Sequence, residues 1–202
     1  MRVVTKEEFL LEAGRFLNSI KEGAVFIYPT DTIYGIGCNA LDSKAVAKIR
    51  EAKERPKAPF SVIAPSIDWI EENCVVTAEG REWLEKFPGP YTLVFRLKNR
   101  RCVSDEVIKG EDSLGIRMPA HWTTRIAKEI GVPIVTTSVN KAGKIFMTSN
   151  EDLDTTIRPK VDFMIDEGEK KAKPSDVIFL NKDEVSVRER TKGSHYPDEK
   201  KI

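Results

Sequence analysis

Short apolar segments alternate with amphipathic helical segments along this chain, and this alternation constrains the fold more than any other feature. Apolar runs between turn signals predict strands, and apolar residues recurring every three or four positions predict helices. Some predicted strands follow one another directly, whereas others are separated by a helix. This irregular order favours one mixed sheet over a strictly repeating doubly wound fold. The predicted fold class is therefore α/β in the mixed α+β sense, a single domain with a large twisted mixed sheet flanked by helices.

The first predicted helix begins with a capping box, because Thr5 and Glu8 can satisfy two backbone N–H groups at a helix start. It ends near Gly23, since glycine commonly closes a helix. Further helices are predicted over 42–53, 66–74, 122–131 and 150–157, together with one that begins at Thr77 and stops before Pro88. Strands are predicted over 24–28, 60–64, 91–97, 114–118, 132–136, 161–165, 176–180 and 184–188, the last two joined by a polar turn at 181–183.

The length of 202 residues fits one domain, since a single core grows to roughly 250 residues before chains tend to split. We predict a domain over residues 1–190 and a disordered tail over 191–202, where apolar content is low. The 33 basic and 32 acidic residues nearly balance, so nucleic-acid binding would need a local patch. The acidic N-terminus and the lack of a long apolar run argue against a signal peptide and a membrane span. Three isolated cysteines favour a reducing cytoplasm and argue against a zinc site.

The segment YPTDTIYGIGCNALD (28–42) is the first that has the residue types of a binding site. Two threonines and two closely spaced glycines follow the end of a predicted strand. Small residues let the backbone approach a ligand, and hydroxyls at a strand end can orient polar atoms. An ordinary glycine turn between a strand and a helix explains the pattern equally well, because it matches neither GxGxxG nor a Walker motif.

Cationic side chains stand in two informative segments. In KERPKAP, the cations Lys53, Arg55 and Lys57 are predicted to lie at an exposed helix exit that two prolines stiffen. They suit a triphosphate, because phosphoryl and nucleotidyl transfer depend on charge neutralisation, although a solvated basic helix end is the commoner explanation.

Arg117 lies inside the apolar strand of GIRMP, where a buried guanidinium needs either a ligand carboxylate or an internal Asp or Glu. His121 follows this strand. A histidine at this position can be a catalytic base, but it is more commonly a capping or exposed residue at the start of a helix.

Hydroxyl and amide side chains gather in VTTSVNKAG (135–143), where a predicted strand runs into a loop. Such groups can hydrogen-bond to ribose or phosphate oxygens, although an ordinary polar turn has the same composition. Ser175 precedes the next-to-last strand in PSDVIF, and Arg188 ends the last strand. Neither residue would be selected as functional by itself.

Taken in order, YPTDTIYGIG, KERP, FPGPYTLVFR, GIRMPAH, TSVN and PSDVIF resemble successive signatures of the YrdC-like family. The resemblance covers approximately residues 23–190. Its most specific elements are the KxR triplet at 53–55 and the SxN triplet at 138–140, with FPGPYTLVF between them. Six matches in the same order identify the chain as similar to that family.

The resemblance implies a nucleotidyltransferase that makes threonylcarbamoyl-adenylate and pyrophosphate from L-threonine, bicarbonate and ATP, for tRNA modification. It implies Mg²⁺ on the triphosphate without a metal site in the protein, downstream threonylcarbamoyl-transfer machinery as a partner, and tRNA or double-stranded RNA as a candidate partner. By motif position, the implied catalytic residues are Lys53 and Arg55. The implied ATP-binding residues are Lys53, Arg55, Ser113, Ser138, Asn140 and Arg188, and the implied threonine-binding residues are Thr32, Arg117, Thr136 and Ser175.

The chain also departs from the family pattern. The loop after KERP is one residue shorter than in many of these synthases, Ile63 stands where some have a threonine-contacting histidine, and VRER (187–190) replaces a common Arg-Pro-Gly or Arg-Glu-Gly. These differences concern the amino-acid substrate more than ATP. Two alternatives stay open: a double-stranded RNA- or tRNA-binding paralogue with weak or no catalysis, and a different carbamoyl transfer, since related domains occur in carbamoyltransferases that mature hydrogenases.

Overall fold

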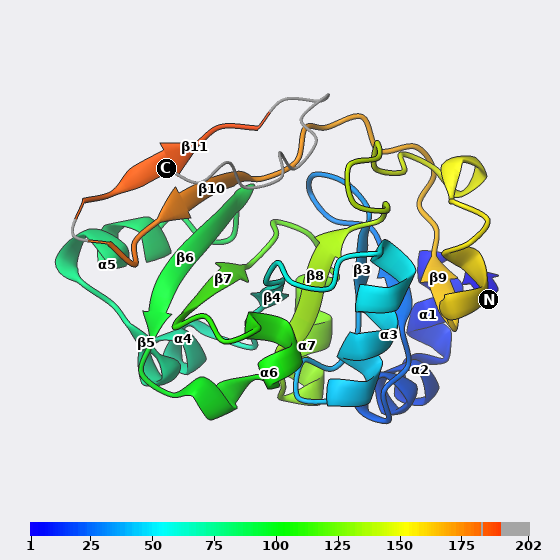
Figure 1. The fold of residues 1–202 in the computed structure, drawn as a ribbon. Coiled ribbons are helices and arrows are strands. Elements are labelled where there is room, and N and C mark those ends of the chain that lie inside the picture. Colours follow the sequence, from blue (N-terminus) through cyan, green and yellow to red (C-terminus); the bar gives the residue numbers. More distant parts are fainter. Residues whose placement is uncertain (183, 191–202) are drawn as a thin grey trace.

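The computed structural model of the protein describes residues 1–182 and 184–190, and its strands form one mixed sheet (Figure 1). The spatial order is β1-β9-β2-β3-β8-β4-β7-β6-β10-β11, with β5 paired to β6, so the predicted fold class is confirmed. The strands are β1 (Arg2–Val4), β2 (Phe26–Tyr28), β3 (Gly35–Gly37), β4 (Ser61–Ile63), β5 (Cys74–Val75), β6 (Tyr91–Leu97), β7 (Ser113–Arg117), β8 (Ile134–Ser138), β9 (Phe163–Ile165), β10 (Asp176–Phe179) and β11 (Ser186–Arg188).

The helices are α1 (Lys6–Leu11), α2 (Ala13–Lys21), α3 (Ser43–Lys53), α4 (Ile67–Asn73), α5 (Ala78–Leu84), α6 (Asp105–Ile108) and α7 (Thr124–Ile130). Short 3-10 turns are η1 (Arg100–Cys102), η2 (Asn150–Asp152) and η3 (Arg158–Lys160). The predicted tail over 191–202 and Asp183 of the predicted polar turn lie outside the described residues.

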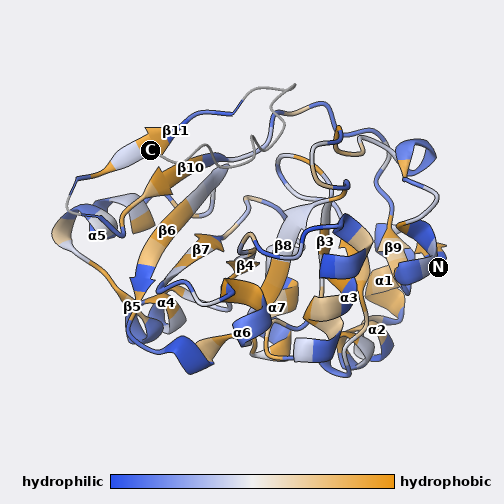
Figure 2. Ribbon diagram, in the orientation of Figure 1, coloured by the Kyte–Doolittle hydropathy of each residue, from blue (hydrophilic) through white to orange (hydrophobic). Residues whose placement is uncertain are grey.

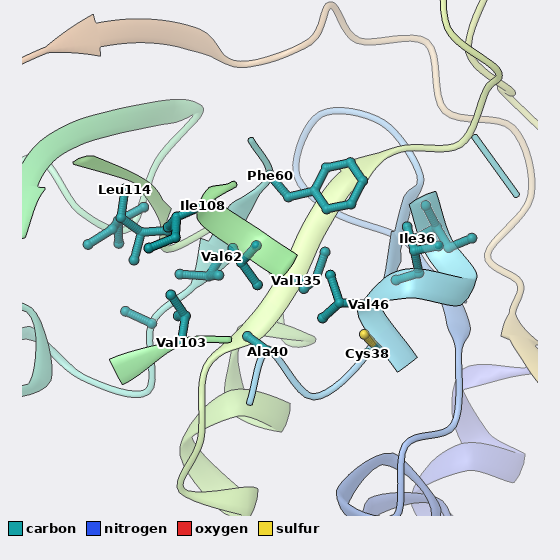
Figure 3. Close-up of a cluster of buried hydrophobic side chains, with 14 of the residues drawn as sticks. Ile36, Cys38, Ala40, Val46, Phe60, Val62, Val103, Ile108, Leu114 and Val135 are labelled. Atoms are coloured by element: carbon teal, nitrogen blue, oxygen red, sulfur yellow. The ribbon is translucent and has the colours of Figure 1, made fainter. Parts of the chain in front are cut away.

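Alternation along the strands divides the apolar side chains between two faces of the sheet. On β4, Val62 joins a cluster with side chains of α3, α4, α5 and α6, whereas Ile63 joins a second cluster with side chains of α1, α2 and α7. On β2, Ile27 belongs to the first cluster and Phe26 to the second. Figure 3 shows part of the first cluster, where Val62 on β4 lies near Val135 on β8. Both faces of the central strands are therefore buried, as expected for nearly continuous apolar runs.

The second face changes from apolar to polar across the central strands. Ser61 shares a face with Ile63, and Thr136 shares a face with Ile134, because alternate residues point the same way. The register pairs Ser61 with Thr136 across β4 and β8, and Arg117 with Ile63 across β7 and β4. Three polar side chains on three neighbouring strands thus lie beside the apolar cluster rather than within it, and they mark the candidate site. Figure 2 shows that the connection between β9 and β10, along the top of the view, is mainly hydrophilic.

The glycine-rich segment after β2 forms a β-hairpin and not the plain turn that the sequence also allowed. Its strand β3 pairs antiparallel with both β2 and β8. A Cβ on Gly37 would lie 2.1 Å from the carbonyl oxygen of Val135. Glycine at this position therefore lets two strands of the same chain approach each other, and a close approach to a ligand does not explain it.

Two predicted helices differ from the structure. The N-terminal helix divides at Glu12 into α1 and α2, although the predicted capping box of Thr5 and Glu8 is present. The predicted helix over 150–157 contains only the 3-10 turn η2, because Asp154 accepts hydrogen bonds from both the backbone N–H and the hydroxyl of Thr156. Such local side-chain bonds offer the backbone an alternative to helical pairing. The short elements β1, β5, η1 and α6 were not predicted, since runs of two to four residues have little periodicity.

Candidate substrate-binding site

A cavity lies over the polar part of the sheet, among the ends of the central strands. Its walls come from β3, β4, β6, β7 and β8 and from the connection between β9 and β10, which runs along the top of the view in Figure 1. Hydroxyl side chains and two arginines dominate the lining: Ser61, Thr92, Arg117, Thr136, Thr137, Ser138, Ser175 and Arg190. Of the predicted threonine-binding residues, Arg117, Thr136 and Ser175 line this cavity directly.

Arg117 meets an internal carboxylate as well as the cavity. Only 7% of Arg117 is exposed, and its guanidinium lies 3.1 Å from the carboxylate of Asp31 and 3.1 Å from the hydroxyl of Thr32. The other oxygen of Asp31 accepts the backbone N–H of Ala120 at 2.9 Å. The expectation that this arginine is buried is confirmed, and the internal partner is Asp31. Because Asp31 and Thr32 hold it against the sheet, the guanidinium presents a fixed positive charge to the cavity.

The expectation that Lys53 lies at an exposed helix exit is wrong. Lys53 is 2% exposed, and its ammonium donates to the backbone carbonyls of Ser138 and Asn140, the latter at 2.8 Å, and contacts the Asn140 side-chain oxygen at 3.4 Å. Burial lowers the pKa of Lys53, and the nearby positive charges of Arg55 and Arg190 lower it further. The lysine of the KxR triplet therefore holds the SxN triplet in place through its backbone, which the sequence pattern did not reveal.

The loop that follows Lys53 is fixed by a cation that the sequence analysis did not select. Arg50 of α3 is 5% exposed and donates to the carbonyls of Arg55 and Ala58, each at 2.9 Å, and to the carbonyl of Glu106 at 2.7 Å. Arg55 is partly exposed and donates to the carbonyl of Pro59 at 3.0 Å. Arg55 is thus the more accessible of the two cations in the KxR triplet. A helical cation that bonds backbone carbonyls has no distinct sequence signal, because it looks like any other basic helix residue.

The SxN triplet forms a compact hydrogen-bonded turn at the end of β8. The hydroxyl of Ser138 donates to the side-chain oxygen of Asn140, whose amide group donates to the carbonyls of Lys141 and Lys144 at 2.9 and 2.8 Å. Ser138 lines the cavity, and the buried ammonium of Lys53 lies against the same turn. The structure therefore brings Lys53, Ser138 and Asn140 together at the end of β8.

Ser175 reaches the cavity at the end of the connection between β9 and β10. Its hydroxyl lies 2.8 Å from that of Thr92 on β6, and both residues are buried. The start of this connection is anchored by Tyr34, whose hydroxyl accepts the N–H of Glu167 at 2.9 Å and lies 2.8 Å from the carbonyl oxygen of Gly168. Anchors at both ends hold Ser175 in the lining of the cavity that Arg117 also lines.

His121 helps to hold the same connection and does not line the cavity. Its Nε2 lies 3.0 Å from Glu167, which also accepts hydrogen bonds from Trp122 and, at 3.0 Å, from Lys170. Its Nδ1 lies 3.0 Å from the hydroxyl of Thr123. Burial lowers the pKa of His121, although the neighbouring Glu167 carboxylate opposes that effect. These contacts give His121 a structural role and do not support the alternative of a catalytic base.

Two predicted site residues lie apart from the cavity lining. Ser113 starts β7, at the opposite end of the strand from Arg117, and pairs with Arg96. Arg188 is exposed, and its guanidinium lies 5.1 Å from the centre of the Phe179 ring. Arg190, two residues later, is the cation of this segment that lines the cavity. Its backbone N–H donates to Asp176 at 2.9 Å. The position was missed because the VRER sequence offers two arginines and motif matching selects the first.

The described residues provide neither a membrane span nor a metal cage. None of the helices described combines the length and apolar character needed to cross a bilayer. Within the same part of the chain, no group of three His, Cys, Asp or Glu side chains is arranged to hold a metal ion. The three cysteines are buried thiols, and burial raises the pKa of Cys102 to about 11.

The comparisons place the chain and its fold in a known family. The model of the Sua5/YciO/YrdC family, described as "Telomere recombination", matches residues 18–190. The chain therefore belongs to the Sua5/YciO/YrdC family, and the resemblance drawn from the six sequence segments is confirmed.

The relatives in this family include named synthases. The putative threonylcarbamoyl-AMP synthase of Methanocaldococcus jannaschii is 38% identical over 175 residues, which cover 84% of this chain and 81% of that protein. The threonylcarbamoyl-AMP synthase of Xanthomonas axonopodis pv. citri is 30% identical over 164 residues, or 77% of this chain and 86% of the relative. The crystal structure of P. abyssi Sua5 complexed with L-threonine matches 92% of this chain at 32% identity with a TM-score of 0.78. This chain spans 55% of that longer protein.

Proposed function

We propose that this chain is an L-threonylcarbamoyladenylate synthase, an enzyme that joins L-threonine, bicarbonate and ATP into threonylcarbamoyl-AMP with release of pyrophosphate. The observation that supports it most strongly is the fixed guanidinium of Arg117 in a hydroxyl-lined cavity, next to the SxN turn. The guanidinium suits an amino-acid carboxylate, and the hydroxyl and amide groups of the SxN turn suit the oxygens of a nucleotide. The names of the relatives favour this catalytic function over an RNA-binding paralogue.

The proposed roles follow from where each side chain lies. Arg117 binds the threonine carboxylate through a planar fork, and Thr136 and Ser175 line the cavity around the amino acid. Thr32 contacts the guanidinium and reaches the amino acid beside it. Arg55 and Ser138 contact ATP, while Lys53 and Asn140 shape the turn that receives it. Arg190 takes the ATP-binding role that motif position gave to Arg188, because Arg190 lines the cavity. Ser113 lies at the far end of β7, so ATP would contact it only by extending along that strand.

This arrangement suits a reaction that needs positioning more than a reactive side chain. Bicarbonate takes up a proton and loses water to give carbon dioxide, which the amine of threonine captures as a carbamate with release of a proton. A carbamate oxygen then attacks the α-phosphate of ATP as pyrophosphate leaves. Two anions must approach each other, so fixed cations and hydroxyl donors provide the stabilisation. Mg²⁺ would be carried by the triphosphate and water, which is usual for this ion. The product is a reactive mixed anhydride, so it would pass to a threonylcarbamoyl-transfer partner that acts on tRNA.

Pyrophosphate release tests this function directly. Purified protein is expected to release pyrophosphate only when L-threonine, bicarbonate and ATP are all present, and to prefer L-threonine over L-serine and other amino acids. Release that does not depend on bicarbonate would indicate plain amino-acid adenylation. No release at all, together with tight binding of double-stranded RNA at high salt, would favour the RNA-binding alternative instead, since charge-driven binding weakens with salt.

Arg190 and Arg188 provide a matched pair of variants. Arg190→Ala is expected to lower kcat/KM for ATP by at least about 10-fold, because one charge-assisted contact contributes about 1.5–3 kcal/mol. Arg188→Ala is expected to change kcat/KM for ATP less than about twofold, because the Arg188 side chain is exposed and lies over the Phe179 ring. Steady-state assays with varied ATP measure both. The reverse order of effects would return the ATP contact to Arg188.

A further inference from the structure

Thr30 and Thr32 form a buried hydroxyl pair at the edge of the candidate site. Thr30 is 1% exposed and Thr32 is 3% exposed, and their hydroxyl oxygens lie 3.0 Å apart. The hydroxyl of Thr30 donates to the carbonyl oxygen of Ile33 at 2.7 Å and accepts the backbone N–H of Thr32 at 3.1 Å. Arg117 in turn donates to the hydroxyl oxygen of Thr32 at 3.1 Å.

Counting hydrogens fixes the direction of each bond. A hydroxyl has one hydrogen to donate and two lone pairs that accept. Thr30 uses its hydrogen on the carbonyl of Ile33, which cannot donate in return. The hydrogen between the two threonines must therefore come from Thr32. Arg117 donates to one lone pair of the Thr32 hydroxyl oxygen, so the other lone pair of that oxygen is available to accept a hydrogen bond from a ligand.

We propose that Thr32 acts toward the substrate as a hydrogen-bond acceptor for the α-amino group, and that Thr30 is the positioning residue that fixes this polarity. This inference rests on the proposed function. A carboxylate has no hydrogen, so Thr32 cannot bind it, and the carboxylate is left to Arg117. The α-amino nitrogen is bonded to the same carbon as the carboxylate. A substrate whose carboxylate meets Arg117 therefore carries its amine to the neighbouring Thr32, 3.1 Å from the guanidinium.

This polarity has a chemical consequence for the proposed reaction. A neutral amine has two N–H bonds and one lone pair. When the Thr32 oxygen accepts a hydrogen bond from one N–H of the amine, the amine is held in one orientation. The lone pair of the nitrogen then stays available to form the N–C bond with carbon dioxide. The proton that the nitrogen then loses passes to water, and the product is the carbamate anion. A donor at this position would instead bond to the lone pair and block the attack.

Ligand analogues separate this role from a general structural one. We compare L-threonine, 2-aminobutanoate, which lacks the β-hydroxyl, and 3-hydroxybutanoate, which lacks the amine, by calorimetric titration. Thr30→Val removes the acceptor for the Thr32 hydrogen while keeping the side-chain shape. It is expected to weaken L-threonine and 2-aminobutanoate by the same factor, about 10-fold, and to change 3-hydroxybutanoate less than about twofold. Thr30→Ser keeps the hydroxyl and is expected to restore binding of both amines.

The outcomes are distinguishable from failure of the proposed function. Wild-type protein that does not bind L-threonine would remove the proposed function itself, whatever the variants do. With wild-type binding established, equal loss for all three ligands would mean that Thr30 only supports the fold, and loss for L-threonine alone would assign Thr32 to the β-hydroxyl. Either result overturns the inference. Melting curves and ATP titrations of Thr30→Val and Thr30→Ser identify a variant that fails to fold, and in that case the analogue comparison is made on Thr30→Ala, for which the same pattern is expected.

Discussion

Arg117→Leu is expected to lower the free energy of unfolding by about 3–5 kcal/mol and to abolish L-threonine binding. The large stability effect follows from Asp31, whose side chain is 11% exposed and would be left as a buried carboxylate without its ion-pair partner. The binding effect follows from the loss of the fixed guanidinium that faces the cavity. Urea denaturation measures the first effect, and calorimetric titration measures the second.

The double variant Asp31→Asn/Arg117→Leu is the control for this prediction. Removing both charges is expected to recover much of the lost stability, because a neutral amide is far less costly to bury. It is not expected to recover L-threonine binding. A single variant as stable as the wild type would contradict the ion pair, and threonine binding retained by Arg117→Leu would contradict the carboxylate assignment.

Lys53→Met is expected to lower turnover by at least about 100-fold, the scale seen when one transition-state-stabilising group is lost. The expected cause is displacement of the SxN turn, since the ammonium donates to the backbone carbonyls of Ser138 and Asn140. The free energy of unfolding is expected to fall as well, by at least about 1.5–3 kcal/mol, because that is the scale of a single hydrogen bond to a charged group and Lys53 makes more than one. This differs from the expectation for an exposed phosphate clamp, which would lose turnover without losing stability.

Lys57→Met is the matched control, because Lys57 lies in the same segment but is exposed. It is expected to change turnover less than about twofold and stability by less than about 0.5 kcal/mol. If Lys53→Met keeps full stability and loses only affinity for ATP, Lys53 contacts the phosphates directly. That result would contradict the positioning role that we assign to it.

Much of the fold could be predicted because its signals are local. The strands around Phe26, Val62 and Val135 are apolar runs between turn signals, and the caps at Thr5 and Asp42 have side-chain bonds to the first helical turn. Likewise, Arg117 in an apolar strand predicted burial beside an anion, which the structure confirms. These inferences need only the residues near one another in the chain.

The remaining features depend on contacts between distant segments. Asp31 and Arg117 are 86 residues apart, and Lys53 is 87 residues from Asn140, so neither pairing has a periodic signal. The burial of Lys53 was missed because a basic residue at a helix end is usually solvated. Arg190 was missed because its role depends on how the chain leaves β11, which VRER does not specify. In each case tertiary packing, and not local propensity, decides what the side chain does.

Product analysis with ¹³C-bicarbonate tests the central claim most directly. Wild-type protein incubated with L-threonine, ATP, Mg²⁺ and ¹³C-bicarbonate is expected to form threonylcarbamoyl-AMP that contains one ¹³C atom, with one pyrophosphate released per product. Mass spectrometry of the freshly quenched mixture detects this adduct and its unlabelled counterpart. An adenylate of threonine without the labelled carbon, or ADP and phosphate in place of AMP-containing product and pyrophosphate, would contradict the account.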